Sequence, residues 1–540
     1  MTVWISRRPD ADIDADLAAS RATAGSLAGV RLAVKDNVDA AGLPTTAGCP
    51  QFAYEPASDA PAVAALRAAG AVVIGKTNLD QFATGLVGTR SPYGAVSDTR
   101  RPGYISGGSS SGSAAAVASG EADIAIGTDT AGSGRVPAGL QGIVGIKPTL
   151  GVISTEGVVP ACESYDCVTI FARDLAQANS AMAAMSAAGD RAWPADTRLS
   201  APPNPVVAVP STLPALDETW QAAFEAAVGI LEKAGVRIVR IDITPFLAAA
   251  RLLYNGALVS ERYAAVGEFI DGNPDAELDP TVTRIVTGAR DIPAHRLITD
   301  RREVARLRTE AMAALDGADA LLVPTAPLHP TLAEVAADPI GVNSAMGTYT
   351  NFCNLFDLCG VAVPTGTAGD AQFGVTVLAR AFEDAVALDI AAMAADVQAP
   401  QQVWPLAAAD HTELVVFGAH LRGGPLVSQL TDLGARWDGE LTTAPRYRMT
   451  VLPTTPPKPA ITRVAAGSEG AALLGHRWLL SPAALGRFLA ALPAPMQLGK
   501  VEFDDGTWRT AFAADASAAT GADISGYGSW PAAIAAGAVH

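Results

Sequence analysis

Short apolar runs alternate with helix-like segments along residues 1–400 of the chain. The spacing predicts a helix over 61–70, with proline in its first turn and glycine at its end, followed by a buried strand at 71–74. The same succession recurs at 113–127 and at 220–241, and further buried strands are expected at 206–209, 320–323, 361–363 and 373–378. Helices that alternate with apolar strands cover both faces of a sheet, so the pattern predicts an α/β fold with a large, mainly parallel or mixed sheet.

A polar, proline-containing connector at 398–405 interrupts this pattern. Beyond it the sequence predicts a small α+β domain that opens with a strand at 414–418. A single core seldom grows beyond roughly 250–300 residues, so a chain of 540 residues is expected to divide. We therefore expect a catalytic domain over 1–400 and a C-terminal domain over 411–540.

Composition and charge exclude several classes of protein. Half of the residues are hydrophobic (49%), which argues against disorder, and the formal net charge of −17 argues against nucleic acid as a partner. No apolar run is long enough to span a membrane, and the first residues lack the apolar stretch of a signal peptide. The five cysteines show no metal-ligand spacing, so we expect buried free thiols, no metal and no cofactor in a soluble cytoplasmic protein.

Two short motifs match common patterns in an unsuitable context. Gly70–Thr77 fits the phosphate-binding pattern G-x4-G-K-[ST], but its central residues form the expected strand rather than a loop, which disfavours an ATP-binding module. Gly108–Gly112 fits the nucleophile-elbow pattern G-x-S-x-G, yet the residues before it read as loop and histidines are scarce. The sequence therefore disfavours a Ser-His-Asp triad at this motif.

Two Gly/Ser-rich loops and one lysine remain. The loops are 106–113 and 127–138, and Lys35 ends an apolar segment in Val30–Val38. Singly, each is better explained as a flexible loop or a solvated lysine. Together they resemble the amidase signature family, which carries Lys-Asp-Asn after a strand, a Gly-Gly-Ser-Ser stretch and a Gly-Thr-Asp-Thr stretch followed by Arg-x-Pro-Ala, in this order and at these separations. The resemblance covers roughly residues 25–395, and Gly142–Thr149 continues it.

The resemblance implies a Ser-cisSer-Lys triad. Ser133 would be the nucleophile, Ser109 the bridging hydroxyl after a cis Gly108–Ser109 peptide bond, and Lys35 the general base. A serine hydroxyl needs a neighbouring base to become a good nucleophile. Lysine serves as that base only when it is neutral, and burial favours the neutral form. Lys35 is therefore expected to be buried.

The resemblance also assigns an oxyanion hole to the backbone amides of Thr130, Ala131, Gly132 and Ser133. Ala131 departs from the family pattern, because many members have glycine there. The departure narrows the backbone freedom at this position but leaves the amide donor in place.

Three segments narrow the choice of substrate. Asp80–Gly94, Leu253–Tyr263 and Phe417–Leu426 resemble allophanate hydrolases, and the last lies in a C-terminal domain that most amidases lack. This implies hydrolysis of allophanate, a small planar anion. Arg262 would pair with its carboxylate in a two-point fork, and the Tyr254 hydroxyl would add a donor. Their spacing of eight residues predicts that both project from one face of a helix. The simpler alternative is a surface pair of Arg262 with its neighbour.

The products would be ammonia and N-carboxycarbamate, which then loses carbon dioxide. The resemblance implicates the C-terminal domain in that decarboxylation, with His420 as the candidate proton donor and His476 behind it; a purely structural histidine is an equal alternative. The resemblance further implies a homodimer and coupling to a urea carboxylase. The alternatives are the amidase subunit of a tRNA-dependent amidotransferase, which fits poorly with a charge of −17, an ATP-binding module and a non-catalytic scaffold. The sequence leaves open whether allophanate arises from urea or from s-triazines.

Overall fold

The computed structural model of the chain describes residues 2–455, 457–515 and 520–539. It divides into two compact units. The first comprises Met1–Ala192 and Asn204–Ala408, and the second comprises Trp193–Pro203 and Ala409–His540. The short segment 193–203 belongs to the second unit because its backbone bonds there, for example from the Leu199 amide to the Gly434 carbonyl at 2.9 Å.

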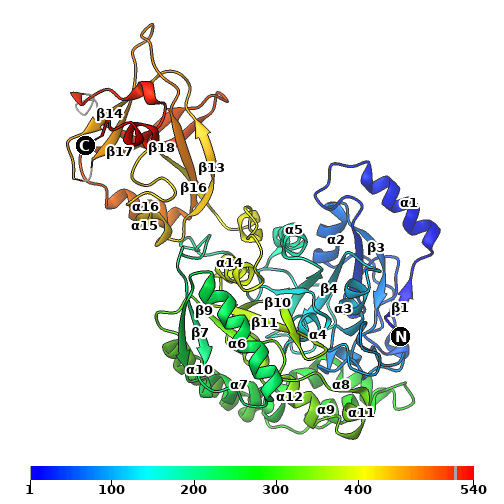
Figure 1. The fold of residues 1–540 in the computed structure, drawn as a ribbon. Helices are drawn as coiled ribbons and strands as arrows, with labels where there is room; N and C mark the ends of the chain where they lie inside the picture. The colour runs from blue at the N-terminus through cyan, green and yellow to red at the C-terminus, as the bar shows by residue number, and fades with distance from the viewer. Residues whose placement is uncertain (1, 456, 516–519, 540) are drawn as a thin grey trace. The chain divides into compact units, whose positions relative to one another are not determined.

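The first unit is built on an 11-stranded sheet in the order β1-β3-β2-β4-β6-β5-β10-β11-β9-β7-β8 (Figure 1). Two groups of strands are parallel, β3-β2-β4 and β9-β7-β8, and the remaining neighbours are antiparallel. The sheet is therefore mixed. Its strands are β1 (Trp4–Arg7), β2 (Arg31–Lys35), β3 (Val72–Thr77), β4 (Ile124–Asp129), β5 (Val144–Lys147), β6 (Cys167–Ala172), β7 (Val206–Pro210), β8 (Arg237–Ile241), β9 (Ala320–Pro324), β10 (Cys359–Ala368) and β11 (Ala371–Ala379).

Helices pack against this sheet and bury it. Helices α3, α4 and α5 contact the strands around β4 to β6, whereas α6 and α14 contact β10 and β11. The strands near the centre are fully buried, which explains why they read as continuous apolar runs rather than as alternating ones. The helices are α1 (Asp10–Arg21), α2 (Pro61–Ala68), α3 (Ser111–Ala118), α4 (Val136–Gln141), α5 (Leu175–Met185), α6 (Glu218–Lys233), α7 (Thr244–Asn255), α8 (Ser260–Gly272), α9 (Pro280–Thr287), α10 (Ala294–Ala314), α11 (Leu332–Ala337), α12 (Gly341–Met346), α13 (Asn351–Leu355) and α14 (Asp384–Ala394).

The second unit is a smaller α+β structure with its own apolar core. Its five-stranded sheet has the order β13-β16-β12-β18-β17, and β14 and β15 form a separate antiparallel pair. The elements are β12 (Thr412–Val416), β13 (Arg436–Thr442), β14 (Tyr447–Leu452), β15 (Lys458–Arg463), β16 (Leu474–Leu480), β17 (Met496–Glu502), β18 (Trp508–Ala514), α15 (Ser428–Thr431), α16 (Pro482–Ala490) and α17 (Trp530–Ala535).

The predicted fold class is confirmed, and each of the predicted strands and helices lies within one or two residues of an observed element or inside it. The five cysteines are buried free thiols, as expected. The pattern did not predict where a helix breaks. Tyr254 lies in the last turn of α7, which ends at Asn255, and Arg262 lies in the first turn of α8, which begins at Ser260, so the prediction of one continuous helix face is wrong. The break falls at Gly256, where a Cβ atom would lie 2.6 Å from the Leu252 carbonyl oxygen and 2.7 Å from the Asp300 carboxylate.

No helix among the described residues is both long and apolar enough to cross a membrane.

Candidate active site

The site is built where two neighbouring parallel strands end. In β2 and β4, Leu32 lies opposite Ile124 and Val34 opposite Ile126, so both strands deliver their carboxyl ends to the same edge of the sheet. Lys35 is the last residue of β2, and β4 runs directly into the loop that carries Ser133. This edge is where open α/β sheets place their ligands.

Three side chains form a hydrogen-bonded chain at this edge. The Lys35 Nζ lies 2.8 Å from Ser109 Oγ, and Ser109 Oγ lies 3.0 Å from Ser133 Oγ. Ser109 follows a cis peptide bond from Gly108 and lies just before Ser110, the N-cap residue of α3. Gly108 has no room for a side chain, because a Cβ atom there would lie 2.1 Å from the Asp80 carboxylate. The structure thus brings together the three residues that the sequence assigned to one triad.

Lys35 has the environment that a general base requires. Its side chain is fully buried, and this burial lowers its pKa to about 7. The carboxylates of Asp80, Asp166 and Asp129 oppose that shift, while the Arg262 guanidinium adds to it. A second hydroxyl, Thr128 Oγ1, lies 2.6 Å from Nζ. With an amine hydrogen given to Thr128, a neutral Lys35 can direct its lone pair at the Ser109 hydroxyl.

A buried ion pair fixes the loop that carries the nucleophile. The Asp129 carboxylate accepts hydrogen bonds from the Gly132 amide at 2.8 Å and the Gly134 amide at 2.9 Å, and it pairs with the Arg135 guanidinium in a two-point fork. Arg135 also donates to Asn354 Oδ1 at 3.1 Å. Gly132 adopts a φ of 137°, and a Cβ atom there would lie 2.4 Å from the Thr350 hydroxyl oxygen. Glycine is required at this position.

The four predicted oxyanion donors are not equivalent. The Gly132 amide already donates to Asp129 at 2.8 Å, which argues against its predicted use as an oxyanion donor. In the described part of the chain, the amides of Thr130, Ala131 and Ser133 donate no hydrogen bond to another protein group. The Thr130 side chain donates to Asp166 Oδ1 at 2.5 Å. Three amides of the loop therefore remain available to an oxyanion.

Arg262 and Tyr254 meet, although they lie on different helices. The Arg262 guanidinium donates to Tyr254 Oη at 3.1 Å and to Thr84 Oγ1 at 2.9 Å. Arg262 is only 2% exposed, so the alternative of a surface pair is wrong; the neighbouring Glu261 pairs instead with Arg301 at 2.8 Å. Across the described residues, no carboxylate forms an ion pair with Arg262. A buried cation without a counter-ion is costly, and an anionic ligand bound at this position would offset that cost.

Comparison with known proteins identifies the family. The amidase family model matches residues 6–388, which include every residue of the site just described. The chain belongs to the amidase family. A second model, the allophanate hydrolase C-terminal domain, matches residues 412–535 of this amidase.

The relatives of this amidase differ in length. A urea amidolyase from Lachancea kluyveri is 42% identical over 90% of this chain, but the chain spans only 28% of that relative's length. The crystal structure of an allophanate hydrolase from Kluyveromyces lactis is 38% identical, has a TM-score of 0.89, and matches over 99% of this chain and 93% of its own. A glutamyl-tRNA(Gln) amidotransferase polypeptide from Natronomonas pharaonis is 32% identical over 67% of this chain and 94% of its own length.

Several residues around the amidase site carried no sequence prediction. Thr128, Asp129 and Arg135 lie inside the quoted motifs, so the motifs themselves were the signal that could have found them. Asn354 and Asp166 lie far from those motifs in sequence. Asn354 reaches the site by donating to the Asp129 carbonyl oxygen at 2.7 Å, a contact that no local pattern indicates.

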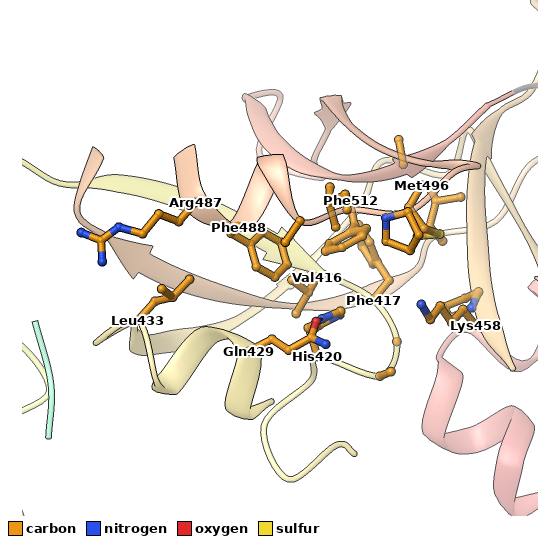
Figure 2. A pocket seen from close by; sticks show the side chains of 18 of the residues that line it. Val416, Phe417, His420, Gln429, Leu433, Lys458, Arg487, Phe488, Met496 and Phe512 are labelled. Atoms are coloured by element: carbon orange, nitrogen blue, oxygen red, sulfur yellow. The ribbon is translucent and has the colours of Figure 1, made fainter. Parts of the chain in front are cut away.

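The second unit of the amidase contains a cavity of about 490 Å³ in which His420 lies (Figure 2). His420 Nε2 is 2.8 Å from Gln429 Oε1, and its ring stacks on Phe512 at 5.1 Å and meets the edge of Phe488 at 5.3 Å. Burial lowers the pKa of His420, and the nearby charge of Lys458 lowers it further. His420 is therefore neutral at neutral pH, held in one orientation and open to a cavity.

His476 lies apart from this cavity. It is a residue of β16, its Nδ1 accepts a hydrogen bond from the Arg422 amide at 2.9 Å, and its Nε2 faces Glu440 at 3.4 Å. It is absent from the residues that line the cavity. Of the two histidines, His420 has the surroundings of a ligand-binding residue.

The Gly70–Thr77 motif forms no phosphate loop. Its Val72–Thr77 part is β3, and the buried Lys76 amine lies 3.3 Å from Asp36 Oδ1 and 3.0 Å from Thr45 Oγ1. Lys76, the lysine that would bind phosphate, is thus already engaged by Asp36 and Thr45. Within the described ranges, no three His, Cys, Asp or Glu side chains gather as metal ligands would.

Proposed function

We propose that this amidase hydrolyses allophanate to ammonia and N-carboxycarbamate, which then loses carbon dioxide. The observation that carries the proposal is a buried Lys35–Ser109–Ser133 chain of hydrogen bonds in the same unit as a buried arginine that forms no ion pair with a protein carboxylate. The relatives named urea amidolyase and allophanate hydrolase support it.

In the proposed reaction, Lys35 takes a proton from Ser109 while Ser109 takes one from Ser133. The Ser133 oxygen attacks the terminal amide carbon, and the amides of Thr130, Ala131 and Ser133 stabilise the resulting oxyanion. The proton held by Lys35 returns through Ser109 to the leaving nitrogen, and ammonia departs. Water then attacks the acyl-enzyme by the same proton path and releases N-carboxycarbamate.

Arg262 would select for the carboxylate of the substrate. The guanidinium is buried and already oriented by Thr84 and Tyr254, so little side-chain freedom is lost when an anion binds. An uncharged amide of similar size would leave this cation unpaired, which is a strong basis for rejection.

The second step would take place in the second unit, where the neutral His420 would relay a proton from water to the nitrogen that loses the carboxylate. The cavity, the fixed imidazole and the cationic Lys458 suit a small anion. In this scheme residues 1–400 form the catalytic domain of the first step and residues 411–540 the domain of the second.

The proposed source of allophanate is a urea carboxylase, either on the same polypeptide or separate, as the name of the urea amidolyase relatives suggests. A homodimer through the first unit remains part of the proposal. Breakdown of s-triazines is the other route to the same substrate.

The amidase component of a tRNA-dependent amidotransferase is the second candidate, because such a polypeptide matches two thirds of the chain. The net charge of −17 and the matched C-terminal domain weigh against it.

The deciding experiment measures ammonia release from allophanate, malonamide, biuret, simple aliphatic amides and glutamine with the same protein. The proposal expects a preference for allophanate of at least about 100-fold in kcat/KM over the uncharged amides, since an unpaired buried charge costs several kcal/mol. Equal activity on the uncharged amides would refute the proposed substrate, and preference for glutamine would favour the amidotransferase.

A further inference from the structure

Asp166 lies beside the nucleophile loop without belonging to it. It directly precedes β6, and Cys167 of β6 pairs with Asp129 of β4, which brings Asp166 next to Thr130. Its carboxylate accepts hydrogen bonds from Thr130 Oγ1 at 2.5 Å and from the Ala161 amide at 2.8 Å. The residue is buried, so these contacts replace water as the partners of its charge.

The segment that holds Asp166 is also bonded to the helix of Arg262. The Ser164 amide donates to Glu261 Oε2 at 2.9 Å, and Glu261 is the residue before Arg262 in α8. Residues 161–166 therefore connect the loop that would stabilise the oxyanion with the helix that would hold the substrate carboxylate.

We propose that Asp166 is a positioning residue of the amide-hydrolysis step, which fixes the Thr130 end of the nucleophile loop relative to the Arg262 helix. The inference rests on the proposed function and adds a residue to it. Asp166 acts through Thr130 and touches no reacting atom.

Loss of the Thr130–Asp166 hydrogen bond should slow the chemical step without weakening substrate binding. Oxyanion donors contribute most when they are aimed at the transition state, and small misplacements cost about 100-fold in rate. Binding of the substrate carboxylate depends on Arg262, which keeps its own partners Thr84 and Tyr254. Loss of the Thr130–Asp166 bond should therefore lower kcat and leave KM nearly unchanged.

The chain offers a matched control for this bond. Thr149 Oγ1 donates to the buried Asp384 carboxylate at 2.6 Å, in the same unit and with the same chemistry. Asp166 is one of the main electrostatic influences on Lys35, and Asp384 is not. Thr130→Val and Thr149→Val each remove one hydroxyl from a buried Thr–Asp pair and keep the shape of the side chain.

The experiment compares these two variants of the full chain. Two rates are measured: turnover of allophanate, and covalent labelling by a fluorophosphonate. In the labelling reaction the Ser133 oxygen bonds to phosphorus, fluoride leaves, and the proton passes through Ser109 to Lys35. Thr130→Val should lower kcat and the labelling rate by about 10- to 100-fold. Thr149→Val should change both by less than about twofold while losing similar thermal stability.

Equal losses in the two variants, or a loss confined to KM, would overturn the inference. The labelling reaction tests the role of Asp166 independently of the proposed substrate. If the wild-type protein reacts with the fluorophosphonate but does not hydrolyse allophanate, the proposed substrate is refuted. The labelling rates of the two variants then still decide the role of Asp166.

Asp166→Asn allows a second measurement, the midpoint of the rate–pH profile, which a purely structural role of Asp166 would leave unchanged. The Asp166 charge raises the pKa of Lys35, as do Asp80 and Asp129, whereas Arg262 lowers it. Removing one anion should shift the midpoint of the rate–pH profile below its wild-type value near pH 7. Thr130→Val keeps the anion and should keep the midpoint; an unshifted midpoint in Asp166→Asn would contradict the assigned position.

Discussion

The two candidate sites of this chain are organised in opposite ways. In the first unit the reacting groups lie at a sheet edge, Lys35 at the end of β2 and the two serines on loops, and each triad side chain is hydrogen-bonded to another. In the second unit His420 projects into a cavity of about 490 Å³ that is lined mainly by apolar side chains, and one amide, Gln429, orients it (Figure 2).

This contrast reflects what each proposed step demands. Acyl transfer needs a nucleophile, a base and several oxyanion donors within hydrogen-bonding reach of one carbon atom, so it tolerates little displacement. Loss of carbon dioxide from N-carboxycarbamate needs one proton at the departing bond. Substitutions should therefore be far more damaging in the first site than in the second.

The largest expected effect comes from Ser133→Ala. Because the nucleophile is lost, ammonia release should fall on the order of 10⁴-fold or more. The matched control is Ser154→Ala, a buried serine of the same unit outside the triad, which should retain wild-type activity. Ammonia release is measured after each purified variant is shown to be folded. Substantial release by Ser133→Ala would remove the triad from the mechanism.

The rate should depend on the ionisation of Lys35. Its pKa of about 7 means that the neutral, basic form predominates above pH 7, so kcat/KM should rise about tenfold per pH unit below that value and level off above it. Lys35→Met should abolish activity across this range. A profile that falls between pH 6 and 8 would contradict the general-base role.

Arg262→Lys tests substrate selection. Lysine keeps the charge but cannot form the two-point fork, so KM for allophanate should rise about tenfold or more, with a smaller change in kcat. Arg301→Lys changes a half-exposed arginine that pairs with Glu261 and serves as the control. An unaltered KM in Arg262→Lys would exclude the residue from the substrate pocket.

His420→Asn should separate the two steps. Ammonia release should stay within about twofold of wild type, whereas carbon dioxide release should lag by about tenfold or more because the proton donor is missing. His411→Asn, in the same unit but outside the cavity, is the control. Simultaneous loss of both products would mean that His420 supports the fold or the first step instead.

The last prediction concerns stability rather than rate. The pKa of Lys35 is about 7 in the folded protein and 10.5 in the reference state, so the unfolded chain binds the extra proton between these values. The free energy of unfolding should therefore rise with pH in this window, relative to Lys35→Met, which lacks the group. Chemical denaturation of both proteins at several pH values measures the difference, and parallel pH dependences would contradict the burial of a titrating lysine.

The first site could be predicted from sequence because its chemistry is carried by short contiguous loops. Lys35, Ser109 and Ser133 each stand in a short motif whose order and spacing are distinctive. The strands around them could be predicted because fully buried strands are continuously apolar.

The remaining features depend on contacts between distant segments. The Arg262–Tyr254 pair was expected on one helix, yet Gly256 breaks that helix and a tertiary hydrogen bond restores the pair. The engagement of the Gly132 amide by Asp129, the bond from Asp166 to Thr130 and the orientation of His420 by Gln429 are likewise set by packing. No local periodicity encodes them.

The ladder between β2 and β4 has a consequence for how such enzymes diversify. The distance from the basic amine to the reacting hydroxyl is set by the register of two adjacent strands rather than by the long stretch of chain between them. Parts of that stretch outside the Ser109 loop and α3 can lengthen or shorten without altering the hydrogen-bonded chain from Lys35 through Ser109 to Ser133. Changes in peripheral segments can therefore alter the substrate that is bound while the three triad side chains keep their positions.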